Sequence, residues 1–314
     1  MSLNWRRFFS RKLNLLALLI LVVFVATAVA ASWLAPPDNP ESPVPFKFVG
    51  DTFQAGLPQP PTPEHLLGIT SNHQDIFYTL IWGTRSALRF GLTATLVTAG
   101  FGIVVGAIGG YIGGILEKII LRITDAFLTF PTIAAVWLFR RALFPSLFSE
   151  ATAVTTAEIT PFQSFIYSLE LDPILLALIF FSWMPYARII NAVVSKLRHS
   201  EFVEAARAMG ASTFRILFRH ILPNAISPAI VLASRDIARM VILAAAFTFI
   251  GLGGNNVAWG AILASERAYV IGISGNPFAY WWTFVPISLA IVLYGIGWNL
   301  LGDGLNELLN PRAV

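Results

Sequence analysis

The chain has 314 residues, of which 56% are hydrophobic and only 12% are charged, and it contains no cysteine. Soluble domains carry about 25% charged residues, so the composition excludes an ordinary water-soluble globule, and its hydrophobicity excludes a disordered chain. The lack of cysteine excludes a disulfide-held secreted domain, whereas the net charge of +4 and the pI near 9.6 leave nucleic-acid binding open until the basic residues are placed.

The first apolar stretch, Leu13–Ala35, contains no charged residue. About 20 apolar residues are enough to cross the hydrocarbon core of a bilayer. A cleaved signal peptide is the alternative, with Ala28-Val29-Ala30 as its cleavage site, but the apolar stretch is longer than the usual signal core. We therefore predict that residues 1–35 form a cytoplasmic tail and the first transmembrane helix.

Residues 36–85 form a proline-rich segment, with nine prolines between Pro36 and Pro63. Closely spaced prolines favour an extended, polyproline-like backbone. This predicts a strap on the outer, extracytoplasmic face of the membrane. A second outer segment, residues 149–172, is polar and acidic, and its role is open.

Five further apolar stretches predict a transmembrane core over residues 86–304, followed by a cytoplasmic tail over residues 305–314. Together with the first helix they predict an all-α integral membrane protein with six transmembrane helices. The five stretches are Phe90–Leu116, Ile119–Leu143, Pro173–Val194, Pro228–Gly253 and Thr283–Leu301.

Glycines recur every four residues in the second stretch. A ridge of small residues lets a neighbouring helix pack closely in a membrane, where lipid supplies no hydrophobic drive for association. We favour simple helix packing, and a sliding contact that moves during transport is the alternative. The glycines are Gly102, Gly106, Gly110 and Gly114.

The basic residues concentrate in the N-terminal tail and in every second loop. Cytoplasmic loops of membrane proteins are enriched in Lys and Arg, so this bias predicts that both termini are cytoplasmic. It also accounts for the high pI and removes the support for nucleic-acid binding. The residues on the predicted inner side are Arg6, Arg7, Arg11, Lys12, Lys118, Arg122, Arg188, Lys196, Arg198, Arg207, Arg215, Arg219 and Arg312.

The long inner loop, residues 195–223, predicts two short amphipathic helices. Phe202, Ala205, Ala206 and Met209 follow the i, i+3, i+4, i+7 spacing of one helical face. Gly210 can end this helix in the left-handed conformation. Ser212 or Thr213 can then cap a second helix, which Pro223 ends or kinks. A partner protein or the bilayer surface fits this pattern equally well, because amphipathicity does not identify what it faces.

Within this loop, Glu204-Ala205-Ala206, Gly210 and Leu222-Pro223 resemble the EAA loop of bacterial ABC-importer permeases. His220 departs from that pattern, which usually has isoleucine there. Further segments resemble the dipeptide, oligopeptide and nickel branch of the family. They are His65–Gly68, Gly109–Gly114, Phe218–Ala225, Phe249–Gly253 with Trp259-Gly260, and Asn299–Leu305 with Asn310–Arg312.

The resemblance implies a type I ABC-importer fold and a coupling helix that docks on a cytosolic ATPase. On this chain the helix carries Glu201, Phe202, Glu204, Ala205, Ala206, Met209 and Gly210. The implied partners are a sister permease, two ATP-binding cassette subunits, an extracytoplasmic solute-binding protein and membrane lipid. Outer-face residues such as Thr70 and His73 depart from the family pattern and leave the solute open.

Three charged residues, Arg235, Asp236 and Arg239, interrupt the fifth stretch. Charges within a membrane span usually face the bundle interior or a wet cavity. The cluster is therefore a candidate translocation path, where Arg235 and Arg239 share a face and could meet a peptide carboxylate. A buried pair between Asp236 and Arg239 with snorkelling side chains is the alternative.

No motif for resident chemistry is present in the sequence. His65, His73, His199 and His220 lack metal-ligand spacing, and no phosphate-binding G-x-x-x-x-G-K-[ST] loop occurs. We expect no cofactor in this chain, with ATP and Mg bound by partner subunits. The resemblance implies that the chain is a non-enzymatic inner-membrane permease subunit for peptides or similar small solutes. A proton-coupled transporter or channel that uses Asp236 is the alternative.

Overall fold

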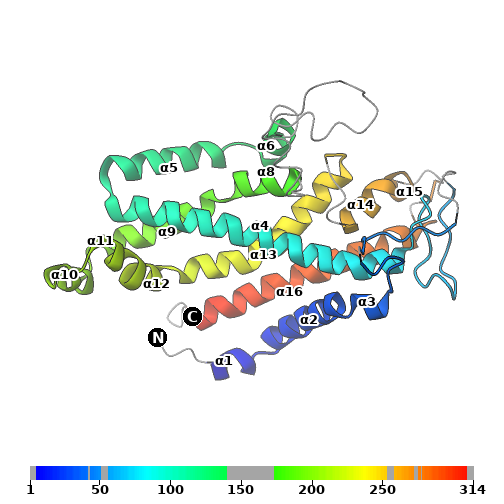
Figure 1. The fold of residues 1–314 in the computed structure, drawn as a ribbon, viewed down its shortest axis with the longest axis horizontal. Helices are drawn as coiled ribbons and strands as arrows, with labels where there is room; N and C mark the ends of the chain where they lie inside the picture. The colour runs from blue at the N-terminus through cyan, green and yellow to red at the C-terminus, as the bar shows by residue number, and fades with distance from the viewer. Residues whose placement is uncertain are drawn as a thin grey trace.

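The computed structural model describes residues 5–41, 43–50, 56–139, 173–252, 258–271, 275–276 and 278–309. These residues form an elongated bundle of long helices (Figure 1). Over the described ranges there is no extended strand, only isolated β-bridges such as Gln59 with Ile69. The predicted all-α membrane class is therefore confirmed at this level.

The N-terminal part folds as three consecutive helices. The Asn14 side-chain amide donates to the carbonyl of Phe8 at 3.0 Å and fixes the corner between the first two. The second helix exposes Leu19, Val22 and Val23, as expected of a helix surrounded by lipid. The three helices are α1 (Trp5–Ser10), α2 (Lys12–Val29) and α3 (Ala31–Leu34).

Helix α4 (Ile76–Ile112) begins well before the apolar stretch at Phe90. The carboxylate of Asp75 accepts a hydrogen bond from the backbone N–H of Tyr78 at 2.8 Å and so caps the helix. At 1.5 Å per residue the helix is about 55 Å long, which exceeds the hydrocarbon core. The first turns of α4 thus lie within the segment predicted as the outer strap.

The third predicted span, Ile119–Leu143, is not one straight helix. Helices α5 (Gly114–Leu128) and α6 (Thr132–Leu138) meet at 91°. Pro131 lies at the break, and a proline disfavours helical geometry in the residue before it. The end of this span and the acidic segment 149–172 lie outside the described residues.

The fourth span consists of two helices in series, α8 (Pro173–Ser182) and α9 (Met184–Leu197). The inner loop follows as α10 (Glu201–Ala208), α11 (Thr213–Arg215), the π-helical η2 (Ile216–Ile221) and α12 (Leu222–Ala225). The second amphipathic helix predicted for this loop is therefore interrupted by a π-helical segment.

Helix α13 (Ser227–Phe249) lies in the middle of the bundle and packs against α4, α9 and the last long helix. Its buried residues join Trp259 and Tyr294 in the main apolar core. The remaining elements are α14 (Ala258–Ser265), α15 (Arg267–Ile271), η3 (Trp281–Thr283) and α16 (Val285–Leu309).

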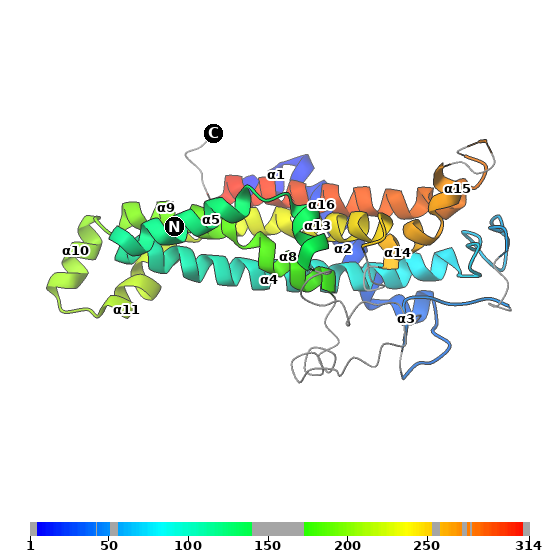
Figure 2. The same ribbon diagram turned by 90° about the horizontal axis from the view of Figure 1, so that it is seen from above.

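Within the described residues, four helices are long and apolar enough to cross a membrane, and the bent α5–α6 pair raises the number of spans to five if it is counted as one span. Helix α13 is not among them, since every window of about 18 residues in it includes Arg235, Asp236 and Arg239. The bundle has two distinct ends. Helix α10, the α4–α5 turn and the C-terminal end of α16 lie toward one, here named the α10 end (Figure 2). Helices α3 and α15 lie toward the other, the α15 end.

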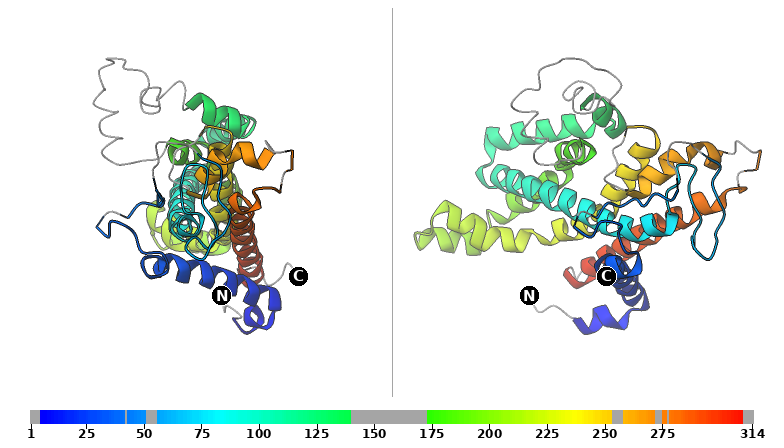
Figure 3. Two further views of the ribbon diagram at one scale, coloured as in Figure 1. Left: turned by 90° about the vertical axis from the view of Figure 1, so that its right-hand side faces the viewer. Right: turned by 45° about the vertical axis from the view of Figure 1, so that its right-hand side comes forward.

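The flanks of the bundle also differ. Helices α2 and α16 pack together on one side, and α5 and α6 lie on the opposite side (Figure 3). Since α4, α9 and α13 lie between them, the residues that join these three helices occupy the centre of the bundle.

Candidate functional site

Helix α10 projects from the bundle. Of the residues predicted to form its apolar face, one is buried and the other three are exposed. Val203 and Ala206 are buried against Ile216, Leu217 and neighbouring side chains. Phe202, Ala205 and Met209 face outward instead. Ala206 was expected on the exposed docking face, but it anchors the helix, because the loop folds back and η2 covers that side.

The outward face of α10 carries an apolar part next to a charged part. Met209 is 82% exposed and Phe202 is 42% exposed. Glu201, Glu204 and Arg207 are also exposed. An exposed apolar patch with a polar rim is typical of a protein interface.

Gly210 ends α10 as the sequence predicts. Its φ is +78°, in the left-handed region that favours glycine. The N–H of Gly210 donates to the carbonyl of Arg207 at 3.0 Å, and the N–H of Ala211 donates to that of Ala206 at 3.0 Å. This is the Schellman geometry of a glycine-terminated helix, and it fixes the direction of the chain after α10.

The glycines of α4 bring its backbone against that of α9. An added Cβ at Gly102 or Gly106 would overlap the carbonyl oxygen of Trp183 or Ala187, and at Gly110 it would lie 2.7 Å from that of Asn191. Gly114 is not on this ridge. Helix α4 ends at Ile112, and Gly114 opens α5 with no atom within 4 Å of its Cβ position.

Gly106→Ala is expected to lower the free energy of unfolding by about 1–3 kcal/mol, because overpacking of a tight contact costs this much. The added methyl overlaps backbone, which cannot rotate away. Gly100→Ala is the matched control in the same helix, since nothing lies within 4 Å of its Cβ position. Thermal unfolding in detergent measures both, and equal melting temperatures would contradict the close packing.

The three charged residues of α13 have different environments. Arg235 forms an ion pair with Asp303 of α16 at the surface of the bundle. Asp236 is only 2% exposed, and it accepts a hydrogen bond from Tyr186 Oη of α9 at 2.9 Å. Arg239 Nε lies 2.8 Å from Asp236 Oδ1, so the i, i+3 pair forms.

Arg239 is held by Asp236 yet remains accessible, with 47% of its side chain exposed. It belongs to a row of exposed residues along one side of α13, here named the α13 stripe. Asp236 points away from that row, toward α9. The α13 stripe consists of Arg235, Arg239, Ile242 and Ala246, with Ile250 directly after the helix.

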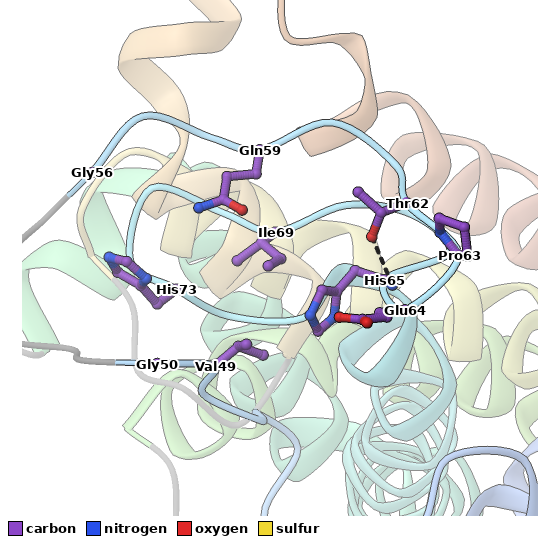
Figure 4. Close-up of a pocket in the computed structure, with 10 residues that line it drawn as sticks. All are labelled: Val49, Gly50, Gly56, Gln59, Thr62, Pro63, Glu64, His65, Ile69 and His73. Atoms are coloured by element: carbon purple, nitrogen blue, oxygen red, sulfur yellow. Dashed lines mark hydrogen bonds between the residues drawn. The ribbon is translucent and has the colours of Figure 1, made fainter.

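A cavity of about 910 Å³ lies at the α15 end and is lined by residues of the outer strap between Val49 and His73 (Figure 4). His65 and His73 line it from opposite sides. His65 Nδ1 lies 2.7 Å from Asp75 Oδ2, which ties the strap to the cap of α4. No cluster of metal-ligating side chains occurs in the described part of the chain.

A buried carboxylate fastens the strap to the α14–α15 corner. Glu266 Oε1 accepts hydrogen bonds from the N–H of Ser71 at 3.1 Å and from its hydroxyl at 2.7 Å. Burial raises the pKa of Glu266, and the bonds from Ser71 oppose that shift. Sequence reasoning missed this contact, because nearly 200 residues separate its members and no local pattern marks them.

The chain matches two family models. Residues 102–314 match the model described as the binding-protein-dependent transport system inner membrane component. Residues 1–55 match the N-terminal TM domain of oligopeptide transport permease C.

Relatives are similar over most of their length. A glutathione transport system permease protein of Pectobacterium atrosepticum is 32% identical over 98% of this chain and 90% of its own. A dipeptide transport system permease protein of Alkalihalophilus pseudofirmus is 30% identical over 98% and 90%. A probable D,D-dipeptide transport system permease protein of Escherichia coli is 31% identical over 81% and 76%.

The first model covers more than half of the chain and includes the whole inner loop. The resemblance carried by Glu204-Ala205-Ala206 and Gly210 is thereby confirmed. With several apolar helices long enough to span a bilayer, the chain is a multi-pass inner-membrane transport protein rather than an enzyme, and it belongs to the family of binding-protein-dependent transport system inner membrane components.

Proposed function

We propose that this chain is one of two transmembrane subunits of an ATP-driven importer and forms half of the translocation path for peptides or similar small solutes. The observation that carries the proposal is the projecting α10 helix, with exposed Phe202 and Met209 inside a loop that matches the family. The printed names of the relatives, which specify dipeptides and glutathione, support a peptide-like solute.

The proposed partners follow from the two unpartnered surfaces. An ATP-binding cassette subunit, which binds ATP and Mg, covers Phe202 and Met209 of α10. A second such subunit serves the sister permease, and that permease faces the α13 stripe across the translocation path. An extracytoplasmic binding protein delivers solute at the α15 end. The stripe carries two arginines, and a guanidinium exposed to lipid at the centre of a bilayer costs at least about 2.5–3.5 kcal/mol. A stripe that faces another protein subunit avoids this cost, which supports the arrangement.

The proposed topology has six spans, with the α10 end in the cytoplasm. It counts the bent α5–α6 pair as one span and includes α13 in spite of its charges. The predicted segments keep their roles in it: residues 1–35 as tail and first span, 36–85 as strap with the start of α4, 86–304 as core with the coupling loop 195–223, and 305–314 as tail. The concentration of Lys and Arg near the α10 end supports this orientation.

In this mechanism, closure of the ATPase pair moves α10. Val203 and Ala206 are buried against Ile216, Leu217 and Ile221, so α10 cannot move without displacing η2 and, through α12, the start of α13. The bundle then opens its path outward and accepts solute.

Proteoliposomes that contain the complete transporter test the proposal directly. Uptake of a dipeptide is expected to require internal ATP and the binding protein, and to survive collapse of the proton gradient by a protonophore. Purification of this chain is expected to recover a sister permease and two ATPases. Uptake that needs the proton gradient but not ATP would instead support the transporter that uses Asp236.

A further inference from the structure

A polar cluster lies where α4, α5 and α9 meet, and two residues separate its last member, Arg198, from the start of α10. Glu117, in the first turn of α5, is at its centre. Its Oε1 accepts a hydrogen bond from Ser195 Oγ at 2.6 Å, and its Oε2 lies 3.9 Å from Arg198 Nη1. Both charged side chains are mostly buried, with 21% and 24% exposure, so solvent screens their attraction far less than that of a surface pair.

The same side chains hold the last turn of α4. Arg198 Nη1 donates to the carbonyl of Gly110 at 3.1 Å. In the amide orientation that satisfies both of its polar atoms, Asn191 donates to Glu117 Oε1 at 3.1 Å and accepts from the N–H of Gly110 at 2.9 Å. The carbonyls of a last helical turn lack partners within the helix, so Arg198 supplies one that α4 needs.

The glycine turn is shaped around this arginine. Gly113 has a φ of +74°, and an added Cβ there would overlap the guanidinium of Arg198. The backbone conformation favours glycine at this position, and a side chain here would displace Arg198 from the space that it fills. We name this set of contacts among Glu117, Arg198, Asn191, Ser195 and Gly110 the Glu117 clamp.

We propose that Glu117 is a positioning residue for coupling: the Glu117 clamp joins the α4–α5 turn to the end of α9, so that movement of α10 is passed to α4. Only His199 and Ser200 lie between Arg198 and the start of α10. Ser200 Oγ donates to the carbonyl of Leu197 at 2.6 Å and stiffens this connection. The inference rests on the proposed function, since it assumes that α10 is the element that the ATPase moves.

The clamp is not needed to hold α4 against α9. Gly102 and Gly106 already bring the two backbones together further along the helices. Loss of Glu117 therefore leaves the bundle packed and Arg198 bonded to the Gly110 carbonyl, but it removes the carboxylate that ties Ser195 and Arg198 to α5. The expected defect is in coupling rather than in assembly.

The test measures solute uptake per ATP hydrolysed by the complete transporter in proteoliposomes. Glu117→Ala is expected to lower this ratio by about fivefold or more, the size of a typical coupling between sites, while ATP hydrolysis continues. Glu117→Gln keeps an acceptor for Ser195 and is expected to show a smaller loss. Asp125→Ala is the matched control, because Asp125 pairs with Arg188 at 3.3 Å across the same two helices but at an exposed position.

The absence of native cysteine permits a second test. The double variant Glu117→Cys with Arg198→Cys is expected to be uncoupled, and a short bifunctional thiol reagent is expected to restore uptake per ATP. An unchanged ratio in Glu117→Ala, or a loss no larger than that of Asp125→Ala, would overturn the inference. So would failure of Glu117→Gln to assemble, which would assign Glu117 to folding. A wild-type chain without ATP-driven uptake would instead refute the proposed function itself.

Discussion

Replacing Glu204 with lysine is expected to reduce ATP-driven uptake by about two orders of magnitude while the chain still folds. Glu204 is exposed in the first turn of α10, the short helix that also exposes Phe202 and Met209. Charge reversal at an interface places like charges together and costs several kcal/mol, and each 1.4 kcal/mol changes an affinity tenfold. A lysine in the first helical turn also opposes the helix dipole.

The variant Glu204→Lys is measured by recovery of the ATPase subunits on a tagged permease and by uptake into proteoliposomes. Glu41→Lys is the control, because Glu41 is also exposed but lies in the outer strap, far from α10 along the chain.

Gly210→Pro is expected to cause a similar loss of ATP-driven uptake, because it changes the direction of the chain after α10. Proline is fixed near φ −65° and cannot adopt the φ of +78° that Gly210 has. Normal ATPase recovery and uptake in both variants would refute the docking role of α10.

The boundaries of α10 were predictable because the signals for them are local. Gly210 and the apolar spacing before it lie within one short segment, and the structure places the turn where they indicate. Which side of α10 is covered was not predictable. Ala206 is buried because η2 folds back onto it, and no periodicity within α10 contains that information.

The spans divide into features that average hydropathy detects and features that it misses. Hydropathy located α2 and α16, which are uniformly apolar and long. It missed the 91° bend at Pro131 and the early start of α4. The bend depends on how α6 packs against α8, and the early start depends on the cap at Asp75. A window average smooths over both features.

For the charged residues of α13, the contact within the helix was predictable from the sequence, and the contacts to other helices were not. Their spacing predicted that Asp236 and Arg239 could pair, and the pair forms at 2.8 Å. The spacing could not predict that Tyr186 donates a hydrogen bond to Asp236 or that Asp303 pairs with Arg235, because these partners belong to α9 and α16. The outcome alters the hypothesis, because Asp236 is buried and orients Arg239 rather than facing a path itself.

Arg239→Leu is therefore expected to lower solute uptake at least about tenfold, which corresponds to a loss of 1.4 kcal/mol. The guanidinium is fixed at its inner side by Asp236, whose carboxylate is fixed in turn by Tyr186. Its outer side is exposed on the α13 stripe, where a solute carboxylate can pair with it through two parallel hydrogen bonds. Arg239→Lys keeps the positive charge but lacks the planar guanidinium that forms two parallel hydrogen bonds. It is expected to retain only part of the uptake.

The control for this experiment is Arg122→Leu, since Arg122 is an exposed arginine of α5 that lies on a different helix from the α13 stripe. Binding to the ATPase subunits is expected to be normal in both variants, because neither Arg239 nor Arg122 lies on α10. A structural role predicts a different pattern. If Arg239 only neutralised Asp236, Arg239→Leu with Asp236→Asn would restore uptake, because no charge is then left unpaired. We expect the double variant to remain inactive, and restored uptake would remove Arg239 from the translocation path.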